Sequence, residues 1–279
     1  MSRARILLVG GAGVFGSRLA LGLAATVDAD VLIAGRDLAK AQKAARDTGS
    51  AGALSLDRAS AKVANIAALN VRLVIDAAGP FQGADLSFAR ACIAAGADYI
   101  DLADARDFVD AFPSLDAEAR AKGVHAITGA SSTPAITHAV LDVLTAGWTR
   151  IDSVHAGISA GNRAPRGRSV IEAILAWVGA PVRVFTDGRW QEKPGWSGTT
   201  RRRVADTGRR RFALAETPDL DLVPKRFAAR EDAVFTAGLE LGVLHGGTAL
   251  IGRLRRLGII RDPRPMAGML QRMATLVHT

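Results

Sequence analysis

An apolar run that breaks into a glycine turn, residues 5–16, constrains the fold more than any other part of the sequence. The run predicts a buried strand, and the glycines that follow have the G-x-G-x-x-G spacing of a turn that opens a helix. In such a turn the first glycine allows the tight bend, the second lets the backbone approach a pyrophosphate, and the third lets the helix pack closely on the strand. The free N–H groups of the new helix would face the phosphates. The residues predicted to contact a dinucleotide here are Gly11, Gly13, Val14, Phe15 and Gly16.

The pattern downstream decides whether this turn is meaningful, since glycine turns alone are common. Apolar runs alternate with helical patterns throughout residues 4–130, which indicates a parallel sheet with right-handed crossovers. Together with the glycine turn, this alternation predicts a dinucleotide-binding domain. The predicted strands after the first are 30–36, 53–57, 71–78, 98–103 and 124–130, and the predicted helices are 15–25, 38–48, 61–69, 84–95 and 106–122, the last interrupted at Pro113.

The end of the second predicted strand indicates the cofactor. An NAD site usually carries a carboxylate about 20 residues after the glycine turn, where it binds the ribose hydroxyls. This sequence has Gly35 and Arg36 there, and Lys40 follows one helical turn later. A guanidinium can pair with a 2′-phosphate in a bidentate manner, so we expect NADP (NADPH) rather than NAD. The alternative is a surface arginine at the end of a strand.

Two further strand ends carry candidate cofactor contacts. Asp57 follows the third strand and could accept a hydrogen bond from the adenine amino group, although a capping role for the helix around 61–69 is an equal alternative. Ala78, Gly79 and Pro80 follow the fourth strand. Small residues are expected there because larger side chains would collide with the pyrophosphate and nicotinamide.

A further helix is predicted after the sixth strand, and the pattern changes from Arg150. Ser131–Pro134 reads as a helix start, with Pro134 near the first helical position, and an amphipathic helix follows to about residue 146. Residues 151–159 then alternate as a half-exposed strand does. We expect a helix over 169–178 and strands over 182–187 and 202–206. The predicted domains are 1–132 for the cofactor and 133–279 for an α+β domain with a mixed sheet that holds the substrate and could serve dimerisation.

Composition excludes several other functions. The chain has 279 residues, a formal net charge of +9 and one cysteine, Cys92, for which a buried apolar role is expected rather than a nucleophilic one. No apolar run reaches the length of a membrane helix. We expect a cytoplasmic protein with no metal site, because His, Cys and carboxylates do not occur at ligand spacing. The basic clusters 201–203, 209–211 and 253–256 lack interleaved aromatic residues, so a solvated surface is favoured over a nucleic-acid site.

Several segments together resemble the saccharopine dehydrogenase-like (saccharopine reductase-like) oxidoreductases: Gly11–Gly16, Ala34–Arg36, Asp76–Phe81, Tyr99–Ala103 and Gly129–Pro134. The resemblance is specific over residues 4–135 and loose beyond them. It implies an α/β protein: a Rossmann doubly wound parallel sheet with a second α+β domain containing a mixed sheet. It also implies NADP-dependent formation or cleavage of a secondary amine between amino acids. A late glycine-rich strand seen in many relatives is missing, which leaves open a second domain shortened at its C-terminal end.

The sequence predicts catalytic residues less sharply than cofactor residues. Hydride transfer needs a group that manages a proton beside the nicotinamide. Candidates near the strand ends are Asp101, Asp104, Ser131, Ser132 and His138, of which we select Asp104, Ser132 and His138. The serines could instead cap a helix, and His138 could be structural.

Two other classes of protein were considered. A short-chain dehydrogenase would need Tyr-x-x-x-Lys, and Tyr99, the one tyrosine, is followed by Ala103. A non-catalytic NADP-binding regulatory or redox-sensing protein stays open as the alternative. The expected partner is a small-molecule substrate, and a homodimer also stays open.

Overall fold

The computed structural model describes residues 3–161, 164, 167–205 and 208–276. Residue contacts divide the chain into two compact units, residues 1–135 and 136–279, and each is described by itself. The predicted domain boundary lay between residues 132 and 133.

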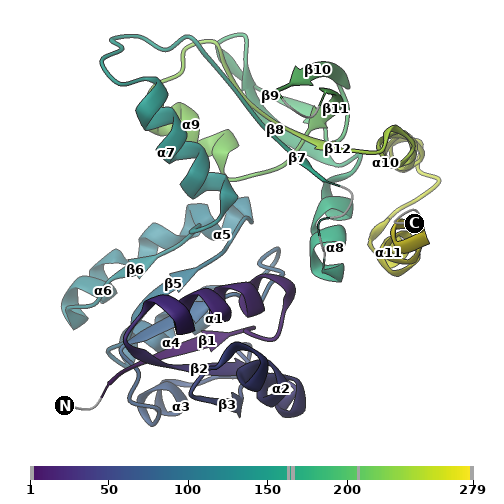
Figure 1. The fold of residues 1–279 in the computed structure, drawn as a ribbon. Helices are drawn as coiled ribbons and strands as arrows, with labels where there is room; N and C mark the ends of the chain where they lie inside the picture. Colours follow the sequence, from purple (N-terminus) through teal and green to yellow (C-terminus); the bar gives the residue numbers. More distant parts are fainter. Residues whose placement is uncertain (1–2, 162–163, 165–166, 206–207, 277–279) are drawn as a thin grey trace. The chain divides into compact units, whose positions relative to one another are not determined.

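Unit 1 is a six-stranded parallel sheet with the strand order β3-β2-β1-β4-β5-β6 (Figure 1). This is the strand order of doubly wound dinucleotide-binding domains. Strands β1 to β3 are added toward one edge of the sheet and β4 to β6 toward the other, so the order reverses between β1 and β4. The strands are β1 (Ala4–Val9), β2 (Ala29–Gly35), β3 (Gly52–Ser55), β4 (Leu73–Asp76), β5 (Asp98–Asp101) and β6 (Ala126–Ile127). The helices are α1 (Val14–Thr26), α2 (Leu38–Thr48), α3 (Val63–Ala67), α4 (Ser87–Ala94), α5 (Arg106–Ala111) and α6 (Asp116–Lys122).

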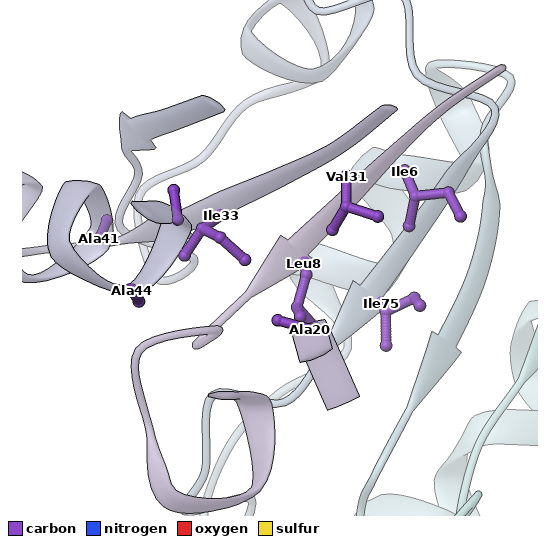
Figure 2. Packing of buried hydrophobic residues seen from close by; sticks show 9 residues of the cluster. Ile6, Leu8, Ala20, Val31, Ile33, Ala41, Ala44 and Ile75 are labelled. Atoms are coloured by element: carbon purple, nitrogen blue, oxygen red, sulfur yellow. The ribbon is translucent and has the colours of Figure 1, made fainter. Parts of the chain in front are cut away.

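Aliphatic side chains of β1, β2 and β4 form the core under α1 and α2. Leu8, Ile33 and Ile75 lie in one cluster with Ala20 of α1 and Ala41 of α2 (Figure 2). The small alanines let the two helices approach the sheet, and the strands are apolar on both faces because helices cover both. This core fixes where the strands end, and therefore where the turns that follow them meet.

Unit 2 contains a mixed sheet, in which β12 pairs parallel with β7 and antiparallel with β8 and β11. Its main path runs β10-β11-β12-β8-β9. The strands are β7 (Ser153–Ala160), β8 (Pro181–Thr186), β9 (Arg189–Pro194), β10 (Thr200–Val204), β11 (Gly208–Leu214) and β12 (Asp232–Leu239). The helices are α7 (Thr137–Leu144), α8 (Arg168–Trp177), α9 (Asp219–Phe227), α10 (Gly242–Arg256) and α11 (Ala267–Leu276).

The predicted fold class is confirmed in both parts, the doubly wound parallel sheet and the second domain with a mixed sheet. Three strands of unit 2, β9, β11 and β12, had no counterpart in the prediction. Asp206, the last residue of the predicted strand 202–206, lies outside the described residues. No helix among the described residues is long and apolar enough to cross a membrane.

The predicted helix start at Ser131–Pro134, with Pro134 near the first helical position, agrees with the backbone angles. Thr133 is extended, with φ −133° and ψ 119°, and it is the one residue of 132–136 with non-helical angles, so the helical path that becomes the regular helix α7 at Thr137 starts at Pro134. The extended angles of Thr133 follow from the proline after it, which disfavours helical backbone in the preceding residue. A Cβ on Gly129 would lie 2.8 Å from the Pro134 ring, so the ring packs tightly against the turn that follows β6.

Candidate dinucleotide site

The glycine turn after β1 brings backbone so close together that side chains are excluded. A Cβ on Gly16 would lie 2.2 Å from the Gly10 carbonyl oxygen, and one on Gly13 would lie 3.1 Å from the same atom. Helix α1 begins at Val14 with Gly13 as its N-cap and no side-chain cap on its first amides. These amides and the positive end of the helix dipole suit the pyrophosphate of a dinucleotide. Phe15 is exposed beside them.

The tight bend is made by Gly10, which corrects the role expected for Gly11. Gly10 has φ +80°, a conformation that glycine adopts far more readily than other residues. Gly11 instead packs against the sheet, since a Cβ there would lie 2.9 Å from the Ile33 side chain. The turn therefore depends on four glycines: Gly10, which makes the bend, and the three glycines of the G-x-G-x-x-G motif.

The turns after β1 and β4 meet at the point where the strand order reverses. A Cβ on Gly10 would lie 2.8 Å from the carbonyl carbon of Ala77 and from Cα of Ala78. Gly79 and Pro80 continue this second turn and are exposed. In open parallel sheets of this kind the ligand binds in the crevice at such a reversal. The structure thus brings the two predicted groups of cofactor residues together at one edge of the sheet.

Arg36 directly follows β2, Lys40 lies in the first turn of α2, and both are exposed. The Lys40 ammonium lies 3.5 Å from the carboxylate of Asp37, and Asp37 also caps α2 by accepting a hydrogen bond from the Lys40 backbone amide. Among the described residues, no carboxylate pairs with Arg36. Of the two predicted cations, Arg36 is therefore the one whose charge is not already matched by the protein.

Asp57 is exposed after β3, at the same edge of the sheet. Its carboxylate accepts a hydrogen bond at 3.1 Å from the backbone amide of Ala59, so it stabilises its own turn. The capping role considered for the next helix is wrong, because α3 begins at Val63 and its N-cap is Lys62.

A buried ion pair supports the turn after β4 and was not predicted. The Asp76 carboxylate is 1% exposed and accepts from Arg58 Nη1 at 2.8 Å and from the Ala78 backbone amide at 2.9 Å. Burial raises the pKa of Asp76 to about 6, and the nearby Arg58 charge opposes that rise. The Arg58 guanidinium also lies 4.6 Å from the ring centroid of Phe81. Asp76 could have been suspected from the sequence, because it is a carboxylate at the end of the apolar run Leu73–Asp76. No sequence feature identified Arg58 as its partner.

Asp101, considered as a catalytic candidate, is held by the protein instead. It is fully buried at the end of β5, and its Oδ1 accepts from Thr128 Oγ1 and from the backbone amides of Ala103 and Gly129 at 2.9–3.0 Å. Burial raises the pKa of Asp101 and these three hydrogen bonds lower it. Asp101 therefore links the end of β5 to the segment after β6, and its buried carboxylate is not exposed to a substrate.

The selected catalytic candidates Asp104 and Ser132 lie in unit 1, and both are exposed. Asp104 follows β5 and accepts a hydrogen bond at 3.2 Å from Gln82 Nε2, in the loop after β4. This contact links the candidate carboxylate to the turn that carries Gly79 and Pro80. Ser131, the neighbour of Ser132, donates to the Thr133 carbonyl and so has a local structural role.

His138 lies in unit 2, on α7, and both of its ring nitrogens face protein groups. Arg226 Nη1 lies 3.2 Å from Nδ1, and Asp219 Oδ1 lies 3.4 Å from Nε2. An arginine can only donate, so Nδ1 is the acceptor in the contact with Arg226. Arg226 is in turn paired with Asp142 at 2.7 Å. This chain of contacts joins α7 to α9 and favours the structural alternative for His138.

Two further sequence expectations concern groups outside this edge. Cys92 is fully buried in α4, and burial raises the pKa of its thiol, so it packs as a small apolar residue. Among the residues that the structure describes, no group of three or more His, Cys, Asp or Glu side chains is arranged to bind a metal ion.

Comparison with known proteins agrees with this geometry. Residues 6–141 match the family model of the saccharopine dehydrogenase NADP binding domain. Among solved structures, the apo saccharopine dehydrogenase (L-Glu forming) from Saccharomyces cerevisiae is 17% identical with a TM-score of 0.61, and the match covers 85% of this chain and 54% of that chain. GenD2 from gentamicin A biosynthesis, in complex with NAD, is 19% identical with a TM-score of 0.45, covering 86% and 66%. A search of curated proteins gave no match.

The chain therefore spans about half the length of the yeast enzyme whose fold it shares. The strand order and the glycine turn lie in unit 1, and the family match covers nearly the same residues. Residues 6–141 are therefore similar to the NADP binding domain of saccharopine dehydrogenase, which supports a saccharopine dehydrogenase-like NADP-binding domain in this part of the chain.

Proposed function

We propose that the protein is an NADP(H)-dependent oxidoreductase that transfers hydride to or from a C=N or C=O bond of a small, amino-acid-like substrate. The observation that carries the proposal is the glycine turn of unit 1, which leaves the first amides of α1 uncapped beside the small-residue turn after β4. The amino-acid-like substrate is inferred from the family, whose named member acts on saccharopine.

Preference for NADP is supported by Gly35 and Arg36 at the end of β2. A Cβ on Gly35 would meet nothing within 4 Å, so the absence of a carboxylate there leaves open space for a 2′-phosphate. Arg36 is exposed next to this space and can pair with the phosphate. When bound, the nicotinamide would supply the hydride, while the residues of unit 1 bind and orient it.

Asp104 is the group that we propose for handling the substrate proton. It is exposed after β5 and receives a hydrogen bond from Gln82, which belongs to the loop next to the proposed nicotinamide turn. Ser132 is a second candidate, as a donor to a substrate carboxylate. His138 ranks third, because Arg226 and Asp219 already face its two nitrogens.

A panel of amino acids paired with 2-oxo acids, followed at the NADPH absorbance, tests the proposal. We expect oxidation of NADPH with at least one pair, and we expect Asp104→Asn to lower kcat by roughly 10²–10⁴-fold, the usual contribution of a proton-transfer group. The NADPH affinity of this variant should be unchanged, and His138→Asn should affect kcat less than Asp104→Asn.

Tight binding of NADPH without turnover of any pair would contradict the enzymatic proposal. It would favour the alternative, a non-catalytic NADP-binding regulatory or redox-sensing protein. A wild-type kcat in Asp104→Asn would remove Asp104 from the reaction and leave the oxidoreductase proposal intact.

A further inference from the structure

The hairpin of β10 and β11 places arginine opposite arginine at three successive positions. Its register pairs Arg201 with Arg211, Arg202 with Arg210, and Arg203 with Arg209. Side chains that lie directly opposite in an antiparallel pair are close neighbours, and like charges there are destabilising. A fold carries such repulsion at a cost unless an anion offsets it.

Four of these arginines share one face of the hairpin. Side chains alternate between faces along a strand, so Arg201, Arg203, Arg209 and Arg211 project together, and we call them the arginine face. On the opposite face the β11 side chains are covered or paired: Phe212 is buried, and Arg210 pairs with Glu240 at 3.0 Å. Within the described residues, no carboxylate pairs with Arg201, Arg203 or Arg209.

The charge of the chain is concentrated in the same unit. Residues 136–279 contain 22 Lys and Arg against 13 Asp and Glu, whereas residues 1–135 contain 14 of each. The formal excess of +9 therefore belongs entirely to unit 2. A surface of this kind attracts an extended anionic partner.

An exposed aliphatic strip begins where the arginine face ends. Arg211 Nη1 donates to the carbonyl of Gly242, the first residue of α10, at 3.5 Å. Val243, Leu250 and Leu257 follow at seven-residue intervals on one side of this helix, and they are 86%, 57% and 64% exposed. Ile259, just beyond the helix, is 67% exposed. Arg253 and Arg256 are exposed in the last turn of α10.

We propose that the arginine face and the aliphatic strip together bind the surface of an anionic lipid bilayer. Basic side chains are attracted to anionic headgroups, and an exposed apolar helix face enters the boundary between headgroups and acyl chains. A nucleic acid would use the arginines but not the strip, because aliphatic side chains do not stack on bases. The combination of the two features selects the bilayer, and the binding is peripheral.

Flotation of the full chain with vesicles tests the proposal. We expect binding to phosphatidylcholine vesicles that contain phosphatidylserine, weak binding to phosphatidylcholine alone, and a decline with added salt. The double variant Arg201→Gln/Arg203→Gln should bind about 30-fold more weakly, from roughly fivefold for each arginine near the surface. Leu250→Ser/Leu257→Ser should also weaken binding.

The matched control is Arg46→Gln/Lys122→Gln, which removes the same charge from exposed helix positions of unit 1. It should bind vesicles as the wild type does. The hairpin variant should unfold at the same temperature as the wild type or higher, since two like-charge pairs are relieved, and its NADPH affinity should be unchanged. This separates a failure here from a failure of the proposed function.

Two results would overturn the proposal. They are no binding of the wild type to phosphatidylserine vesicles, and equal loss of binding in the hairpin variant and in the control. Salt-sensitive retention of duplex DNA together with the first result would assign the arginine face to a nucleic acid.

Discussion

Gly16 lies where α1 passes closest to the turn after β1. The position that a Cβ would occupy is 2.2 Å from the Gly10 carbonyl oxygen and 2.7 Å from Cα of Gly11. Both neighbours are backbone atoms, so a side chain at this position cannot be accommodated by a change of rotamer. The whole first turn of α1 would have to move away from the sheet, and with it the amides that are proposed to bind the pyrophosphate.

Gly16→Ala should therefore destabilise the protein by at least about 1–3 kcal/mol, the usual cost of overpacking, and should weaken NADPH binding. Gly22→Ala is the matched control on the same helix. Nothing lies within 4 Å of its Cβ position, so it should stabilise by up to about 1 kcal/mol through helix propensity. Urea unfolding and NADPH titration of both variants measure this. Equal stability of the two variants would contradict the close packing.

At the scale of elements, a buried polar network ties the loop after β3 to β4 and β5. Arg58, from the loop, pairs with Asp76 at the end of β4, and the Tyr99 hydroxyl of β5 lies 3.4 Å from the same carboxylate. Burial raises the pKa of Asp76 to about 6, above the ordinary value of 3.8 for an aspartate. The folded protein therefore binds the Asp76 proton more tightly than the unfolded chain does.

The sign of the resulting pH dependence is unusual for an aspartate. Between about pH 4 and pH 6 the folded state binds more protons, so the contribution of Asp76 to the free energy of unfolding falls as pH rises, by about 3 kcal/mol in all. The difference in stability between wild type and Asp76→Asn should fall across this window and be constant above it. Urea unfolding at a series of pH values measures the difference.

Asp85→Asn provides a control of opposite sign. Hydrogen bonds from Ser87 lower the pKa of Asp85, so the stability that Asp85 contributes should be lost as pH falls. A wild-type minus Asp76→Asn difference that does not change between pH 4 and 7 would show that the buried carboxylate does not hold its proton as described.

The elements also show what the sequence could and could not predict. The strands of unit 1 are apolar on both faces because helices cover both, so β1, β2 and β4 were recognisable as apolar runs. β9 and β11 were not, since Arg189–Pro194 and Gly208–Arg211 are largely charged or polar and show no apolar run, although each pairs with the strand just before it. The same holds for the candidate site. The glycine turn could be predicted because its glycines are neighbours in the sequence, whereas Arg58 and Asp76 are 18 residues apart and meet only in the folded protein.

At the scale of the whole molecule, the two units differ in sheet type and in charge. Unit 1 has the parallel sheet, the glycine turn and no net charge, and unit 2 has the mixed sheet and the whole basic excess. This division fits a chain in which one unit binds the dinucleotide, while the other is proposed to hold the substrate and to contact a charged surface. The central claim rests on unit 1, because its geometry and its family match coincide.

Titration of the full chain with NADPH and with NADH, followed by nicotinamide fluorescence, tests that claim most directly. We predict tighter binding of NADPH, and loss of the preference in Arg36→Ala by roughly 10–100-fold, the value of a charged hydrogen bond to phosphate. Lys43→Ala, on the neighbouring helix and paired with Asp47, should retain the preference. Equal affinity of the wild type for the two nucleotides would contradict the assignment of NADP, and binding of neither would contradict the dinucleotide site itself.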